Sequence, residues 1–260
     1  MTEILIPVLI VGVIGLVAGV GLSLAAKFMA VPVDETQEKL SEALPGANCG
    51  SCGYSGCDGY AAALAAGEAT PDKCSPGGAE TAAKLAEILG VEAGKIKPLV
   101  AYIACKGNAE NSVLKYEYSG FKSCTAASLI HSGPLSCAYG GIGFGDCMRV
   151  CQFGAITLID GRPVINEELC ASCGKCVSAC PKGLISLIPK DAAVRVGCGN
   201  KAKGAAVAKA CKVSCLSCMQ CEKNCPVGAV KVENNIAVID YEKCTSCGKC
   251  KEVCKRGVIQ

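Results

Sequence analysis

The chain has 260 residues, of which 23 are cysteine, one is histidine and none is tryptophan, and its formal net charge is +3. Cysteine at this level is typical of disulfide scaffolds and metal proteins. With four phenylalanines and 31 glycines, the composition excludes a fold that depends on one large apolar core. Disulfides, zinc or iron–sulfur clusters must therefore contribute to the structure.

The first predicted element is a transmembrane helix within residues 1–30. Ile4 to Ala26 forms a stretch of 23 residues without a charge, and about 20 apolar residues suffice to span a bilayer. A signal peptide would need a basic segment before a shorter apolar core. Because Lys27 follows the span, the positive-inside rule predicts a single-pass protein of the cell membrane with cytoplasmic cysteines. Disulfides are rare in a reducing cytoplasm, so the thiols are predicted to be metal ligands.

A small helical domain with one 4Fe–4S cluster is predicted at residues 34–93, with helices over 34–44 and 79–89. Its cysteines have the spacing C-x2-C-x4-C-x16-C and are named set A: Cys49, Cys52, Cys57 and Cys74. Four thiolates are enough for one cluster. Residues 94–136 are predicted to be a connecting segment.

Two copies of one unit follow, unit 1 at residues 137–190 and unit 2 at 198–260. Six cysteines of one copy align at a constant offset with six of the other, which indicates an internal repeat. Each copy also holds two short β-branched stretches joined by a turn, at Asp160-Gly161 and at Asn234-Asn235, and this pattern predicts a β-hairpin. The predicted fold class is α+β: a transmembrane helix, a small helical 4Fe–4S module and two tandem units that resemble bacterial ferredoxins.

The cysteine runs of unit 2 have the spacing of a two-cluster bacterial ferredoxin, C-x2-C-x2-C-x3-C. In that arrangement three thiolates of a run bind one 4Fe–4S cluster and the fourth binds the neighbouring cluster. Zinc sites usually take two separated pairs of ligands, so the runs favour iron–sulfur clusters over zinc. The rule predicts three complete sets: set B in unit 1, with Cys151, Cys170, Cys173 and Cys176; set C, with Cys215, Cys218, Cys221 and Cys254; and set D, with Cys225, Cys244, Cys247 and Cys250.

The remaining site of unit 1 is incomplete, because Gly141 and Phe144 occupy the positions of Cys215 and Cys218. With the nearest replacement it has three predicted thiolates: Cys137, Cys147 and Cys180. The alternatives are a cluster completed by another cysteine or by Asp146, a 3Fe–4S cluster, or no cluster. Four cysteines are left over, which are either ligands of a sixth cluster or free thiols: Cys105, Cys124, Cys198 and Cys211.

Charge and composition argue against nucleic acid as a partner. From Lys190 to the C-terminus there are 13 Lys and Arg against six Asp and Glu. Bound clusters are anionic, so these cations offset cluster charge, and aromatic residues for base stacking are nearly absent. The chain has no Gly-rich phosphate loop, and His131 alone forms no catalytic centre. No catalytic acid, base or nucleophile is predicted.

In this order, the membrane span, the C-x2-C-x4-C-x16-C module and the two ferredoxin units resemble the B subunit of the Rnf complex. The resemblance covers essentially the whole chain and is most specific in three segments: LPGANCGSCGYSGC, GDCMRVCQFGAI and VGCGNKAKGAAVAKACKVSCLSCMQC. It implies that set A binds one cluster. It also implies a subunit that accepts electrons from soluble reduced ferredoxin, with other Rnf subunits and the membrane as partners. Such a complex reduces NAD and translocates Na+ or H+.

This chain departs from the expected family pattern at Gly141, where cysteine is expected, and at Gln152 and Lys255, where proline is expected. Two other functions stay open on the sequence. One is the electron-transfer subunit of another membrane-bound complex, such as a hydrogenase or a dehydrogenase. The other is a non-redox zinc scaffold.

Overall fold

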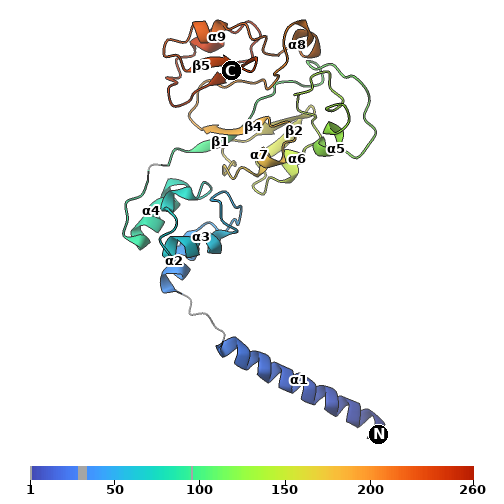
Figure 1. Ribbon diagram of the computed structural model, residues 1–260, viewed down its shortest axis with the longest axis vertical. Coiled ribbons are helices and arrows are strands. Elements are labelled where there is room, and N and C mark those ends of the chain that lie inside the picture. Colours follow the sequence, from blue (N-terminus) through green and yellow to red (C-terminus); the bar gives the residue numbers. More distant parts are fainter. Residues whose placement is uncertain (1, 29–33, 95) are drawn as a thin grey trace.

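The computed structural model describes residues 2–28, 34–94 and 96–260. Figure 1 shows a small helical module in blue and cyan, followed toward the C-terminus by a part that contains every described strand. The elements in chain order are α1 (Thr2–Phe28), α2 (Glu35–Ala43), α3 (Cys57–Ala65), the 3-10 helix η1 (Pro71–Lys73), α4 (Gly78–Leu89), β1 (Leu99–Ile103), α5 (Cys124–Ser128), α6 (Asp146–Arg149), β2 (Ile156–Ile159), β3 (Arg162–Ile165), α7 (Lys175–Ala179), β4 (Ile185–Pro189), α8 (Ala205–Ala210), α9 (Gln220–Lys223), β5 (Val230–Glu233), β6 (Ile236–Ile239) and α10 (Lys249–Glu252).

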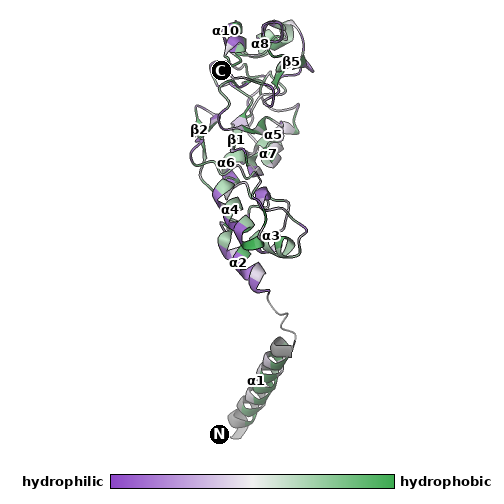
Figure 2. Ribbon diagram, turned by 90° about the vertical axis from the view of Figure 1, so that its left-hand side faces the viewer, coloured by the Kyte–Doolittle hydropathy of each residue, from purple (hydrophilic) through white to green (hydrophobic). Residues whose placement is uncertain are grey.

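The N-terminal stretch predicted to be a transmembrane helix is helical, as α1. Figure 2 shows hydrophobic residues along the described part of this helix. Among the residues whose side chains the structure describes, no helix is long and apolar enough to cross a membrane.

The helical module packs α2, α3 and α4 around one core, in agreement with the two predicted helices. Its central side chains are Leu40, Tyr60 and Leu85, each at most 1% exposed, and Cys74 of set A packs against the same core. The side chain of Asp34 accepts a hydrogen bond from the amide of Thr36 at 2.9 Å and so caps α2. The core therefore fixes one end of the loop that carries set A.

Both predicted hairpins are confirmed. Strands β2 and β3 pair antiparallel, as do β5 and β6. The turns lie where the sequence places them: φ is +51° and +70° at Asp160-Gly161, and +49° and +67° at Asn234-Asn235. Two consecutive left-handed residues match the right-handed twist of a two-residue hairpin.

A third sheet joins β1 to β4, which the repeat pattern did not predict. The pairs run from Leu99 opposite Pro189 to Ile103 opposite Ile185. Unit 2 has a shorter counterpart, in which Val196 pairs with Ile259. The predicted start of unit 1 at residue 137 therefore omits its first strand, because that strand contains no cysteine to mark it.

Candidate metal centres

Four loops share one backbone conformation, and three of them carry sets B, C and D. In each loop the third and fifth residues have a positive φ, and the two residues in each loop are Gly143 and Gly145, Ser172 and Gly174, Ser217 and Met219, and Ser246 and Gly248. Left-handed residues at alternate positions are typical of a nest, a loop in which successive backbone amides face an anion. The loop at 141–147 keeps this shape although it lacks two thiols.

All four thiols of set B line a single cavity, together with the first strand of unit 1. The amide of Ala155 donates to Cys151 Sγ at 3.3 Å, and the amide of Ala101 in β1 donates to Cys170 Sγ at 3.5 Å. Hydrogen bonds to the sulfur atoms are one means by which a protein tunes an iron–sulfur cluster. Strand β1 is thus part of the set B site.

Set C lines a larger cavity that includes its crossed cysteine, Cys254. The amide of Val258 donates to Cys254 Sγ at 3.3 Å. Arg256 lies on the same cavity, and its Nε atom is buried without a hydrogen-bond partner among the described residues. An unpaired buried guanidinium nitrogen is costly, and an anionic group in the cavity would relieve that cost.

Set D lies around the hairpin of unit 2. Cys225, Cys244 and Cys250 belong to one packed core with strands β5 and β6. The amide of Ala229 donates to Cys225 Sγ at 3.3 Å, the same contact that Ala155 makes in set B. Cys247 is exposed in the loop between Cys244 and α10.

The four thiols of set A line one cavity in the helical module, between the end of α2 and the start of α3. The side-chain oxygen of Asn48 accepts a hydrogen bond from the amide of Cys57 at 2.8 Å. A Cβ at Gly56 would lie 2.9 Å from the same oxygen, so a larger residue there would displace the Asn48 side chain. These contacts hold the loop closed around the cavity.

The remaining seven cysteines are grouped differently from the expectation. Cys137 lines a cavity with three of the four leftover thiols, and these four cysteines are named the junction set: Cys105, Cys137, Cys198 and Cys211. Cys124 instead lies close enough to Cys147 to raise the pKa of its thiol. Burial is the main cause of that rise, to about 11, and Cys124 and Cys180 add to it. These three form the three-cysteine set: Cys124, Cys147 and Cys180.

The carboxylate of Asp146, which the sequence allowed as a replacement ligand, is engaged by other groups in this structure. Its carboxylate accepts hydrogen bonds from the amides of Cys124 and Thr125, at 2.9 and 3.0 Å, and from the hydroxyls of Ser123 and Thr125. It also forms an ion pair with Arg149. Burial raises the pKa of Asp146, but these hydrogen bonds outweigh it and hold the pKa below the ordinary value. Asp146 therefore positions Cys124 at the start of α5.

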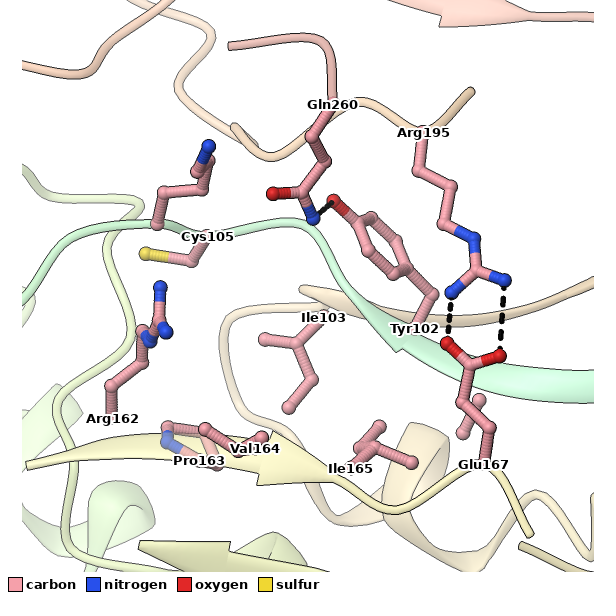
Figure 3. A pocket seen from close by; sticks show the side chains of 12 residues that line it. Tyr102, Ile103, Cys105, Arg162, Pro163, Val164, Ile165, Glu167, Arg195 and Gln260 are labelled. Carbon is pink, nitrogen blue, oxygen red and sulfur yellow. Dashed lines mark hydrogen bonds and ion pairs between the residues drawn. The ribbon is translucent and has the colours of Figure 1, made fainter. Parts of the chain in front are cut away.

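A pocket at the boundary between the two units contains an ion pair (Figure 3). The guanidinium of Arg195 pairs with both carboxylate oxygens of Glu167, and its hydrogen bond is the main reason that the pKa of Glu167 is lowered. Gln260 donates to the hydroxyl of Tyr102 at 2.9 Å, and Cys105 lies on the same pocket. The end of unit 2 is thereby fixed against β1 and β3.

Two further observations concern other candidate sites. His131 is exposed, as expected for a residue outside any site, and its carbonyl accepts a hydrogen bond from Lys115 Nζ at 2.8 Å. Among the described residues, no group of three or more His, Cys, Asp or Glu side chains is arranged to hold a single metal ion. All 23 cysteines are free thiols, and every one belongs to one of the six sets.

Ferredoxin hairpins, nest-forming loops and thiols around shared cavities define the class of the protein: it is an iron–sulfur protein with two ferredoxin-like units. Comparison with known families agrees. A model described as "Putative Fe-S cluster" matches residues 44–76, a 4Fe-4S dicluster domain matches 137–185, and 4Fe-4S binding domains match 212–228 and 237–260.

Comparison with curated proteins places the whole chain in one family. The B subunit of the Na(+)-translocating ferredoxin:NAD(+) oxidoreductase complex of Acetobacterium woodii is 44% identical over 100% of this chain and 78% of its own length. The B subunit of the proton-translocating complex of Clostridium ljungdahlii is 40% identical, over 100% and 93%. The B subunit of the ion-translocating oxidoreductase complex of Methanosarcina acetivorans is 36% identical, over 95% and 94%. The chain belongs to the family of B subunits of ion-translocating oxidoreductase complexes.

Proposed function

We propose that this chain is the iron–sulfur electron-transfer subunit of a membrane complex that couples ferredoxin:NAD oxidoreduction to ion translocation. It accepts electrons from reduced ferredoxin and passes them to other subunits. The observation that carries the proposal is the set of cavities lined by four thiols in a chain that is similar over its full length to such subunits. The relatives' names include both Na+ and proton translocation, so the coupling ion stays open.

Sets A, B, C and D would each hold a 4Fe–4S cluster, which supplies one-electron chemistry when bound. The chain's own residues bind and tune these groups. Amides donate to the thiolate sulfur atoms, as Ala155, Ala229 and Val258 do. With the clusters bound, the crossed cysteines would link distant segments of each unit, because each is separated in sequence from the rest of its set: Cys151, Cys225 and Cys254. No proton transfer by a side chain is required.

The three-cysteine set would hold a three-iron cluster. Its loop has the nest conformation of the other sites, but Gly141 and Phe144 stand at two of the ligand positions. Cys124 supplies one replacement, and Asp146 is engaged in the cap of α5. Without a fourth protein ligand, one corner of a cube has no thiolate to retain its iron.

Helix α1 would anchor the chain in the cell membrane, with the clusters in the cytoplasm. The support is the uncharged stretch from Ile4 to Ala26 and Lys27 directly after it. A charge at the centre of a spanning helix costs about 3 kcal/mol on insertion scales. Gly15→Arg should therefore release the protein from membranes washed with carbonate, whereas Gly15→Ala should not. Equal retention of both variants would refute the anchor.

The direct test of the function is anaerobic mixing of the full chain with reduced ferredoxin. Bleaching of the iron–sulfur absorbance of the chain, with matching oxidation of ferredoxin, is expected. Clusters that dithionite reduces but ferredoxin does not would contradict the proposed donor. A subunit of a hydrogenase or another dehydrogenase is the second candidate. It would be favoured if the copurifying subunits included no flavin-bearing or ion-translocating protein.

A further inference from the structure

The junction set lies around a cavity formed by segments far apart in the sequence. Cys105 follows β1, Cys137 begins the first cysteine segment of unit 1, and Cys198 and Cys211 flank α8 in unit 2. The cavity is similar in size to the cavities of set A and set B. Folding has thus assembled a fourth thiol-lined cavity from residues that share no short motif.

The repeat explains why these four cysteines meet. Cys137 and Cys211 occupy equivalent positions of the two copies, at the constant offset that relates the other repeated cysteines. Cys105 lies two residues after Ile103, whose partner is Ile185, and Cys198 lies two residues after Val196, whose partner is Ile259. Ile185 and Ile259 are related by the same offset, so Cys105 of unit 1 corresponds to Cys198 of unit 2. Each unit therefore contributes two thiols to the set, from equivalent positions. Unlike a group of chance buried cysteines, this set obeys the symmetry of the cluster-binding units.

Hydrogen bonds at these thiols resemble those at the ferredoxin sites. The buried side-chain amide of Asn200 donates to Cys137 Sγ at 3.4 Å, and its backbone amide donates to Cys198 Sγ at 3.5 Å. The amide of Cys215 also donates to Cys198 Sγ, at 3.4 Å. Three donors directed at two sulfur atoms stabilise the thiolate form.

The burial of the four thiols also supports a metal site. Cys137, Cys198 and Cys211 are buried, and Cys105 is half-buried. Four thiols that lie in one enclosed cavity, with amide donors directed at their sulfur atoms, provide the same surroundings as the cavities of sets A and B. Thiols that bind a metal do so as thiolates, which are stronger acceptors for these amide donors.

The position of the set connects the two units. Cys198 packs in one small core beside Cys215 and Cys254 of set C. On the other side, Lys182 lies near Cys137 of the junction set and also near Cys180, which belongs to the three-cysteine set. Lys182 is held in place because it donates to the carbonyls of Ser132 and Ala138 at 2.7 and 2.9 Å. A redox centre here would stand between the sites of unit 1 and those of unit 2.

We infer that Cys105, Cys137, Cys198 and Cys211 bind a 4Fe–4S cluster at the junction of the two ferredoxin-like units. This cluster passes single electrons between them: it gains one electron from a reduced neighbouring cluster and gives one to the next, and no bond is made or broken in the chain. The role as a relay rests on the proposed function, whereas the presence of the cluster does not.

The test is metal and sulfide analysis of the anaerobically purified full chain carrying Cys198→Ala or Cys137→Ala. Loss of about four irons and four sulfides per chain is expected from each variant. Ser214→Ala is the matched control, because Ser214 is buried on the same cavity and is not a thiol; its iron content should equal that of the unsubstituted protein. Iron unchanged in both cysteine variants would overturn the inference, and so would loss of one zinc in place of iron.

A second variant covers the case in which a cysteine variant fails to fold and loses most of its iron. Asn200→Ala keeps all four thiols but removes the donor to Cys137. Since this donor favours the more negative, reduced cluster, the variant should shift the potential of one cluster to a more negative value at unchanged iron content. A redox titration identical to that of the unsubstituted protein would overturn the inference. If the iron losses and the shift in potential were observed but ferredoxin reduced none of the clusters, the proposed function would be refuted and the junction cluster would not.

Discussion

Replacing Phe144 by cysteine should convert the three-cysteine set into a complete four-thiolate site. Phe144 is the repeat equivalent of Cys218 and lies between Gly143 and Gly145, whose φ values of +88° and +78° reproduce the loop around Cys218. A thiol at this position therefore starts from the backbone geometry of a ligand in set C. The fourth iron would then be retained.

The expected gain is about one iron per chain, together with loss of the EPR signal that an oxidised three-iron cluster gives. The substitution also removes a ring contact, because the centroids of Phe144 and Tyr118 lie 5.5 Å apart. That contact is worth about 0.5–1.5 kcal/mol. In the apoprotein this corresponds to a fall of about 2–4 °C in the melting temperature per kcal/mol.

EPR of the oxidised protein is the primary assay, since one iron added to the iron of six clusters is a small change. Phe144→Ala is the control: it loses the same ring contact but supplies no thiol, so the three-iron signal should persist. The reasoning is refuted if the unsubstituted protein has no three-iron signal, or if Phe144→Cys leaves that signal at full intensity.

Three other predictions follow from the geometry. Cys254→Ala should remove about four irons, those of set C, and should leave set D intact although Cys254 belongs to the second cysteine run; loss of set D alone would show that the ligands do not cross. Leu85→Ala should destabilise the helical module by about 2–5 kcal/mol, because Leu85 is fully buried in the core that contains Cys74, and protease cleavage between residues 34 and 93 should accelerate; unchanged cleavage would contradict the packing. Glu167→Gln should cost about 0.5–1 kcal/mol at pH 7, a low value because the Glu167 side chain is partly exposed to solvent. Since Arg195 lowers the pKa of Glu167 in the folded state, this difference in unfolding free energy should vanish as the pH falls through that lowered pKa, and a difference that grew in acid would refute the assignment.

The sequence predicts features that depend on local spacing. The cysteine runs and both hairpin turns follow from short patterns, and the turns at Asp160-Gly161 and Asn234-Asn235 are confirmed. The helices of the small module are predicted for the same reason, because their caps and apolar positions lie within one segment.

The grouping of the isolated cysteines depends on pairing between distant segments. The sequence predicts that Cys137 joins Cys147 and Cys180 in an incomplete site of three thiolates, since it is the nearest replacement in sequence. The pairing of β1 with β4 brings Cys105 to the junction instead, and the cap made by Asp146 brings Cys124 to Cys147. One signal was present in the sequence: Cys137 and Cys211 are separated by the repeat offset, which indicates equivalent roles for the two thiols.

Iron and acid-labile sulfide counted in the anaerobically purified, full-length protein test the central claim most directly. Five four-iron clusters and one three-iron cluster predict about 23 irons per chain, with negligible zinc. A count near 16 irons, the value for sets A to D alone, would contradict both the junction cluster and the three-iron cluster. Zinc in excess of iron would contradict an electron-transfer protein altogether.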